Sequence, residues 1–198
     1  ATGVEASTLG VPGETELRGK GVSYCATCDG AFYRDKPVAV IGGGNAAVEE
    51  AVFLTKFASR VYIVHRRDKL RADKIVQERA LANDKIEVIW NSNLKKIVGD
   101  TKVEGIVTMD KNTLERTEID VDGVFFYIGS IPNTTFCEGT IDLDERDFVL
   151  TDEKLQTSMP GVFACGDCRA NRLKQVAVAV GEGALAAVEA DKYIEETF

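Results

Sequence analysis

The order of apolar and polar residues changes its period several times along the chain. Residues 37 to 41, PVAVI, form a β-branched run that stops at three glycines, and residues 45 to 58 carry apolar positions at helical spacing. A second β-branched run, at residues 60 to 65, follows after about one helix length. This order predicts a βαβ unit with a parallel sheet and a right-handed crossover. The helix is expected to bury Ala47, Val48, Ala51, Val52, Leu54 and Phe57.

The pattern continues with a predicted helix at residues 71 to 83 and a third strand at residues 86 to 90. Between residues 94 and 129 the apolar positions alternate or run together, with turn residues between them, which predicts an antiparallel meander. From about residue 131 the chain is irregular until a closing helix that begins near Gln175. We therefore predict an α/β protein with a domain boundary near residue 130.

Composition and charge narrow the range of functions. The chain has 198 residues, 44% of them hydrophobic, so it is long enough to bury a core. Its formal net charge of -8 disfavours a protein that binds nucleic acid through the phosphate backbone. No stretch reaches the roughly 20 apolar residues of a membrane span, and the first residues lack the pattern of a signal peptide. We expect a soluble cytoplasmic protein without a membrane or nucleic-acid partner.

The glycine-rich segment after the first predicted strand matches the pattern G-x-G-x-x-A through Gly42, Gly44 and Ala47. At this place small residues allow a pyrophosphate to approach the backbone, and the start of the helix supplies N–H donors and a partial positive charge. The same glycines also fit a tight turn in any α/β protein. The end of the next predicted strand helps to choose between these interpretations.

A basic segment, HRRDKLRADK, stands at residues 65 to 74, where an NAD site usually presents an acidic residue. Arg66, Arg67 and Arg71 favour a 2′-phosphate and therefore NADP over NAD. A solvated basic helix start is the alternative, but basic residues are electrostatically unfavourable in a first helical turn. His65, the only histidine, is expected to be a packing or cofactor-edge residue and not a catalytic base.

Two of the five cysteines form the segment CATCD, in which Asp29 follows Cys25 and Cys28. Five cysteines are too few and too odd for a secreted disulfide framework. A zinc site would need further ligands, for which Cys165 and Cys168 are the candidates, although no zinc-ribbon pattern surrounds them. A disulfide-exchange pair needs only two close thiols and a group that moves protons, which Asp29 can provide. Two free buried thiols remain a third interpretation.

The segments CATCDGAFYRDKPVAVIGGGNAAVEEA, HRRDKLRADK and GVFACGD together closely resemble the low-molecular-weight NADPH-dependent thioredoxin reductases. The resemblance covers essentially the whole chain. It implies a Rossmann-like, three-layer NADPH domain at residues 8 to 130, with a parallel sheet, an antiparallel meander and the redox disulfide. Residues 1 to 7 and 131 to 198 would belong to a second, FAD-binding α/β domain.

The resemblance also implies an activity and the residues that perform it. Electrons would pass from NADPH through FAD to a Cys25–Cys28 disulfide and then to thioredoxin, in a homodimer whose domains rotate about two hinges. Asp29 would be the acid, and no metal is implied. We assign Cys28 as the flavin-facing thiol that also attacks the substrate, and Cys25 as its resolving partner. The implied nucleotide site is Gly42, Gly43, Gly44, Asn45, Ala46, His65, Arg66, Arg67 and Arg71, and the flavin residues are Gly166, Asp167, Lys174, Gln175 and Val176.

The chain also departs from the family pattern. Family members carry a long segment ahead of the opening ATG, including a first glycine loop for FAD, so we expect this chain to be a fragment or to lack that segment. Cys165 and Cys168 stand where the family shows small apolar residues, and Cys137 is given no role. Two other functions stay open: a related flavin-linked disulfide reductase with another donor, such as ferredoxin, or another substrate, and a non-catalytic NADPH-binding module.

Overall fold

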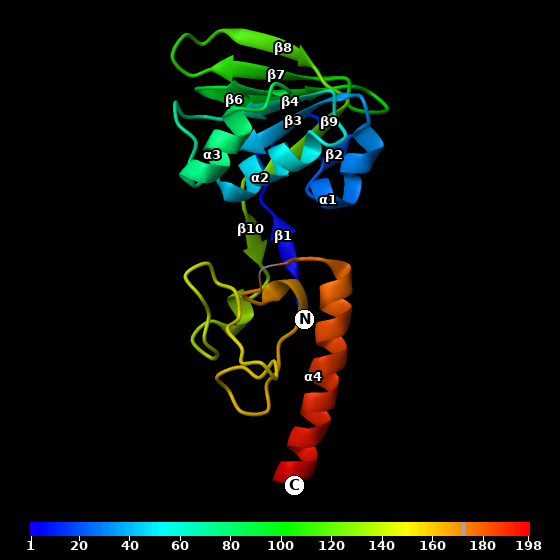
Figure 1. Cartoon of the computed structure of the whole chain (residues 1–198). Coiled ribbons are helices and arrows are strands. Elements are labelled where there is room, and N and C mark those ends of the chain that lie inside the picture. Colours follow the sequence, from blue (N-terminus) through cyan, green and yellow to red (C-terminus); the bar gives the residue numbers. More distant parts are fainter. Residues whose placement is uncertain (172) are drawn as a thin grey trace. The chain divides into compact units, whose positions relative to one another are not determined.

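The computed structural model describes residues 1 to 171 and 173 to 198. These residues form two compact units, which are described separately (Figure 1). The larger unit is Thr8–Ile128, and the smaller unit joins Ala1–Ser7 to Gly129–Phe198. The domain limits expected from the sequence, residues 8 and 130, enclose the larger unit.

A five-stranded parallel sheet forms the centre of the larger unit. Strands β3 (Pro37–Gly42) and β4 (Arg60–Val64) pair in parallel, from Pro37 with Arg60 to Ile41 with Val64, which confirms the predicted βαβ unit. In spatial order the strands of the sheet are β2 (Val22–Ser23), β9 (Gly123–Tyr127), β3 (Pro37–Gly42), β4 (Arg60–Val64) and β5 (Ile86–Ile89).

Helices α2 (Asn45–Leu54) and α3 (Lys74–Leu81) cover one face of this sheet (Figure 1). Successive residues of a strand point to opposite faces, so Val38 and Val40 of β3 pack with the helices. Ala39, between them, packs on the other side. The buried residues of α2 are Ala47, Val48, Ala51 and Leu54, while the other two predicted positions, Val52 and Phe57, are half-buried.

An antiparallel sheet of three strands covers the opposite face (Figure 1). It consists of β6 (Ser92–Val98), β7 (Gly105–Asp110) and β8 (Arg116–Asp120), with an irregularity in pairing between Leu94 and Lys96. Leu94, Ile97 and Ile106 from this sheet enter the second core cluster. The larger unit therefore has the three layers that were expected from the sequence.

The predicted meander is too long at its C-terminal end. Residues 123 to 127 form β9, which does not belong to the antiparallel sheet. It lies between β2 and β3 in the parallel sheet and pairs with both. The reason is that this run is apolar on both sides: Phe125 packs with the helices, whereas Val124 and Phe126 pack with the meander. Gly123 is required here because a Cβ would overlap the ring of Tyr33.

The smaller unit contains little regular structure apart from one long helix. Strand β1 (Val4–Ala6) pairs antiparallel with β10 (Ser130–Pro132). Short 3-10 helices, η2 (Thr135–Cys137) and η3 (Gly166–Cys168), precede α4 (Val176–Thr197). Helix α4 buries only Ala186 and exposes Val176, Val180, Val188 and Ile194.

Helix α4 is also the longest of the described helices. Within the part of the chain that the structure describes, no helix combines the length and the apolar character that crossing a bilayer requires.

Replacing Phe125 with alanine tests the place of β9 in the core. The ring of Phe125 is fully buried and meets Tyr33 edge-on, with 5.2 Å between the ring centroids. We expect the free energy of unfolding to fall by about 3–5 kcal/mol. Urea unfolding followed by the fluorescence of Trp90, the only tryptophan, reports this core because Trp90 packs against it. The same change at the exposed Phe32 should cost less than about 0.5 kcal/mol, and equal losses would contradict the assignment.

Candidate active site

The cysteine pair lies at the start of a short helix in the larger unit. Cys25 and Cys28 form a disulfide with 5.3 Å between their Cα atoms, which confirms the predicted pair. Cys25 is the N-cap of α1 (Ala26–Asp29), and its Sγ accepts a hydrogen bond of 3.2 Å from the backbone N–H of Cys28. Cys25 is half-buried, whereas Cys28 is exposed. Cys28 is therefore more accessible to a partner than Cys25.

Polar groups hold this helix in position. Ser23 Oγ donates to Asp29 Oδ2 at 2.7 Å and accepts from the backbone N–H of Cys25 at 3.1 Å. The backbone N–H of Ala26 donates to the hydroxyl oxygen of Tyr127 at 2.7 Å. Ser23 ends β2 and Tyr127 ends β9, so neighbouring strands supply the two anchors. Neither residue was predicted from the sequence, because neither belongs to a recognisable motif.

The surroundings of the Tyr127 hydroxyl favour its protonated form further. Burial raises its pKa far above the usual range, and the nearby carboxylates of Glu50 and Asp29 add to this shift. The hydrogen bond from Ala26 acts in the opposite direction. Tyr127 is therefore a neutral acceptor for the helix amide at neutral pH.

A half-buried carboxyl group on α2 acts on the same hydroxyl. Burial raises the pKa of Glu50, and repulsion from Glu49 raises it further. Its Oε2 atom is inaccessible to solvent and makes no hydrogen bond with the described residues. Helix α2 thus places a carboxyl group with a raised pKa near the hydroxyl that anchors the disulfide helix.

The glycine loop connects β3 to α2. A Cβ at Gly42 would lie 2.6 Å from the carbonyl oxygen of Tyr127 and 2.7 Å from the Cβ of Ala47, so only glycine fits. At Gly44 the space for a side chain is open, and this residue caps α2 without a side-chain hydrogen bond. Asn45 and Ala46 are exposed at the start of the helix. The start of α2 is therefore accessible to solvent, as an anion site requires.

The basic segment follows β4 directly. Arg66, Arg67 and Arg71 are exposed, and none of them forms an ion pair with another described residue. Three guanidinium groups without carboxylate partners are able to bind a phosphate dianion. His65 precedes them and is buried, with both ring nitrogens on backbone carbonyl oxygens.

Hydrogen bonds bring the glycine loop and the basic segment together. The backbone N–H of Arg71 donates to the carbonyl oxygen of Gly43 at 2.7 Å. Asn45 and Asp73 form a reciprocal pair: Asn45 Nδ2 donates to Asp73 Oδ2 at 3.0 Å, and Asp73 N donates to Asn45 Oδ1 at 2.7 Å. The role of Asp73, which caps α3, was not predicted from the sequence, because its partner lies 28 positions away. These hydrogen bonds hold the two predicted segments next to each other.

The residues expected to bind flavin lie in the smaller unit. Gly166 has a positive φ of 78°, and its N–H donates to Glu182 Oε2 at 2.7 Å. Glu182 also forms an ion pair with Arg169 at 2.6 Å, so a carboxylate of α4 anchors the loop. Glu182 carried no signal in the sequence. Asp167 is half-buried, Val176 is exposed, and Gln175 is the N-cap of α4.

Lys174 also holds this loop in place. Its Nζ donates to the carbonyl oxygens of Asp167 at 2.8 Å and Arg169 at 3.0 Å, and to Asn171 Oδ1 at 3.1 Å. Burial lowers the pKa of Lys174, although Asp167 partly offsets the effect. The ammonium group is thus occupied with holding the loop.

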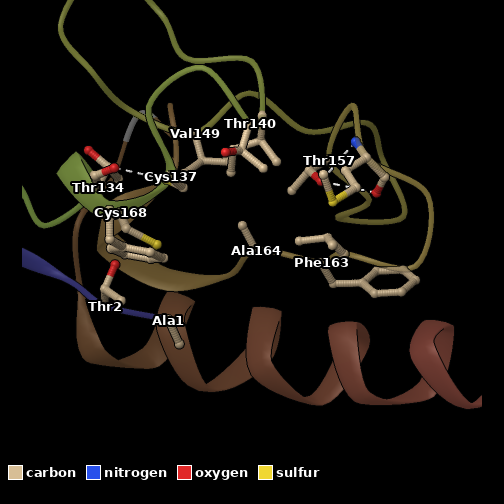
Figure 2. Close-up of a pocket in the computed structure, with 14 residues that line it drawn as sticks. Ala1, Thr2, Thr134, Cys137, Thr140, Val149, Thr157, Phe163, Ala164 and Cys168 are labelled. Carbon is tan, nitrogen blue, oxygen red and sulfur yellow. Dashed lines mark hydrogen bonds between the residues drawn. The ribbon is translucent and has the colours of Figure 1, made fainter.

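A cavity of about 310 Å³ lies in the smaller unit, and most of its lining is apolar (Figure 2). Cys137 and Cys168 both line it. The thiol of Cys137 donates to the carbonyl oxygen of Thr134 at 2.9 Å, and that of Cys168 to the carbonyl oxygen of Cys165 at 3.4 Å. Among the described residues no three Cys, His, Asp or Glu side chains gather as metal ligands, so the zinc alternative gains no support.

Comparison with known proteins agrees with this arrangement. A family model described as pyridine nucleotide-disulphide oxidoreductase matches residues 1–183. The chain belongs to this family.

Its relatives are thioredoxin reductases. The chain is 50% identical to the thioredoxin reductase of Peptoclostridium litorale, over 100% of this chain and 65% of the relative. It is 48% identical to that of Listeria monocytogenes, over 99% of this chain and 62% of the relative. The crystal structure of thioredoxin reductase from Streptococcus pyogenes superposes with a TM-score of 0.93 at 46% identity, covering 98% of this chain and 64% of that one. The chain therefore spans less than two thirds of the length of these relatives.

Changing Tyr127 to phenylalanine tests its role as an anchor of the disulfide helix. The variant leaves the buried N–H of Ala26 without its acceptor, which costs about 1–3 kcal/mol. Hydrogen exchange at the Ala26 amide should become about 5- to 150-fold faster. Tyr33→Phe is the matched control, because the Tyr33 hydroxyl makes no hydrogen bond with the described residues. Unchanged exchange at Ala26 in Tyr127→Phe would show that the hydroxyl is dispensable.

Proposed function

We propose that this chain provides the NADPH site and the redox disulfide of a thioredoxin reductase. The observation that carries the proposal is the Cys25–Cys28 disulfide, which belongs to the same compact unit as the glycine loop and the three unpaired arginines. The proposal covers transfer of two electrons from NADPH, through FAD, to the disulfide of thioredoxin. The thioredoxin reductases to which the chain is similar support this choice of substrate.

The nucleotide residues fit a phosphorylated dinucleotide. Gly42 and Gly44 leave the start of α2 open to a pyrophosphate, while Arg66, Arg67 and Arg71 supply charge for a 2′-phosphate. A ferredoxin-fed reductase has no use for such a phosphate site, so the arginines favour NADPH as the donor.

The loop in the smaller unit fits part of a flavin site. The half-buried Asp167 carries its carboxylate beside Gly166, at the N-terminal side of α4. On this chain Gly166, Asp167, Lys174, Gln175 and Val176 would hold FAD, which would supply the two-electron step between NADPH and the disulfide. The relatives are longer than this chain, so we place the complete reaction in a chain of their length, as a homodimer.

The protein's own residues account for the chemistry at sulfur. Addition of two electrons breaks the Cys25–Cys28 bond, and the sulfurs then carry negative charge that protons must neutralise. Asp29 lies next to Cys28 and is oriented by Ser23, so it can hand over and recover a proton. The exposed Cys28 thiolate would attack a thioredoxin disulfide, forming a mixed disulfide and releasing one thiolate of thioredoxin. Cys25 would then attack Cys28 Sγ, which reforms the original bond and releases reduced thioredoxin.

Replacing the three arginines with alanine tests the choice of nucleotide. Each guanidinium contact to a phosphate contributes about 1.5–3 kcal/mol, so the triple variant should bind NADP⁺ at least about 100-fold more weakly, while NAD⁺ binding stays the same. Isothermal titration calorimetry measures both affinities. Arg60→Ala is the control, because Arg60 is exposed at the opposite end of the same strand. A loss that is equal for the two nucleotides would defeat the proposal.

Single cysteine variants test which sulfur attacks. A thioredoxin that keeps only its attacking cysteine is activated as a mixed disulfide with a chromogenic thiol. Cys25→Ser should release the chromogen and form a stable covalent complex, because Cys28 is exposed, whereas Cys28→Ser should react much more slowly. Absorbance and intact mass follow the reaction, and the double variant gives the background from Cys137, Cys165 and Cys168. The opposite order would exchange the roles of the two sulfurs.

A further inference from the structure

His65 lies between the two halves of the nucleotide site. It is 4% exposed and follows the last residue of β4. Its Nδ1 lies 3.0 Å from the carbonyl oxygen of Gly42, in the glycine loop. Its Nε2 lies 3.0 Å from the carbonyl oxygen of Lys69, in the basic segment. One ring therefore bridges the segment that would hold the pyrophosphate and the segment that would hold the 2′-phosphate.

Both partners of the ring are acceptors. A carbonyl oxygen carries no proton, and a neutral imidazole has only one N–H group. The neutral ring therefore satisfies one contact and places a nitrogen lone pair against an oxygen at the other. Only the imidazolium form donates at both ends.

The surroundings oppose that charged form in the free protein. Burial is the main cause that lowers the pKa of His65, and the charges of Arg71 and Arg67 lower it further, whereas the two carbonyl contacts raise it. Two charged groups of other elements lie along these segments: Asp73 hydrogen-bonds with Asn45, and Lys111 Nζ donates to the carbonyl oxygen of Arg66 at 3.3 Å. At neutral pH the ring of the free protein is therefore neutral and donates only one of the two hydrogen bonds.

We propose that His65 is a proton-linked clamp, and that a nucleotide with a 2′-phosphate closes it by causing the ring to take up a proton from solvent. The inference rests on the proposed NADPH site. A phosphate dianion among Arg66, Arg67 and Arg71 offsets the positive charge that disfavours the imidazolium. Nδ1 then donates to Gly42 and Nε2 to Lys69, and the two segments are held together. His65 acts here as a positioning residue and does not touch the reacting atoms.

The ring of His65 is tightly packed against the glycine loop. A Cβ on Gly43 would overlap Nδ1 and Cε1 of His65, so the ring lies directly against the middle glycine. The carbonyl oxygen of the same glycine accepts from the Arg71 amide at 2.7 Å. A change in the ring's hydrogen bonds therefore acts on the glycine loop and on the basic segment together.

The sign of the pH dependence follows from proton linkage. A ligand that raises the pKa of His65 is bound together with a proton, so its affinity rises as the pH falls from above the bound pKa to below the free pKa. The phosphate ester itself has a second pKa of about 6 and loses protons when guanidinium groups bind it. Because these two effects oppose each other in the total proton count, the ring has to be observed directly.

The only histidine of the chain gives a single ring signal, which makes this observation unambiguous. The ¹³C-labelled Cε1–H resonance of the 198-residue chain is titrated with pH alone, with saturating NADP⁺ and with saturating NAD⁺. We expect the midpoint to lie below about 6.5 in the free chain, to rise by about one pH unit or more with NADP⁺, and to stay near its free value with NAD⁺. Two ring N–H signals with NADP⁺ at neutral pH would support the clamp independently.

The outcomes separate the clamp from the function on which it rests. If NADP⁺ binds more tightly than NAD⁺ but the midpoint does not move, the clamp is wrong and the NADPH site stands. If the two nucleotides bind equally, both proposals fail. His65→Gln, which keeps one donor and does not titrate, should weaken NADP⁺ binding about 3- to 10-fold, as expected for one lost hydrogen bond. An unchanged affinity in the His65→Gln variant would also overturn the clamp. The titrations of the unaltered chain do not depend on whether this variant folds.

Discussion

The pairing of β9 with β3 is the constraint on which the arrangement of the site depends. Gly42, the last residue of β3, stands opposite Tyr127, the last residue of β9. The close approach of Gly42 to the Tyr127 carbonyl fixes where the glycine loop begins, and the Tyr127 hydroxyl fixes where the disulfide helix begins. A shift of one residue in this register would turn Tyr127 to the other face of the sheet and remove the anchor of Ala26. The sheet thus sets the distance between the nucleotide loop and the disulfide.

Local patterns in the sequence predicted the elements that local contacts determine. The βαβ unit follows from apolar periodicity and three glycines. The disulfide was implied by the resemblance to the thioredoxin reductases, because the spacing of the two cysteines alone also fitted a zinc site or two free thiols. The place of β9 was predicted incorrectly because its apolar run fits either sheet. Its partner β3 lies more than 80 positions earlier in the chain, as the pairing of Val38 with Gly123 shows. No periodicity within a short window records such a choice.

The supporting residues of the candidate site escaped prediction for the same reason. Ser23, Asp73 and Glu182 are ordinary polar residues whose partners are separated from them in the sequence by 6, 28 and 16 positions. What identifies them is a hydrogen bond in the folded chain. Arginines and glycines indicate a phosphate site by their residue type, whereas the polar residues that orient them give no such indication. Sequence motifs therefore predict the groups expected to touch a ligand better than the groups that hold them.

The two compact units hold their candidate sites by different means. In the larger unit, two apolar clusters pack against the two faces of the sheet. The glycine loop, His65 and the residues that anchor the disulfide helix lie at the ends of its buried strands. In the smaller unit, the loop with Gly166 and Asp167 is held mainly by charged groups, since Glu182 binds Gly166 and Arg169 while Lys174 ties three oxygens. Polar anchors of this kind are stabilised less by burial than by each other, so losing one weakens the rest. The fold that carries the nucleotide site is therefore expected to tolerate surface substitutions, whereas the fold of the loop around Asp167 depends on a complete network.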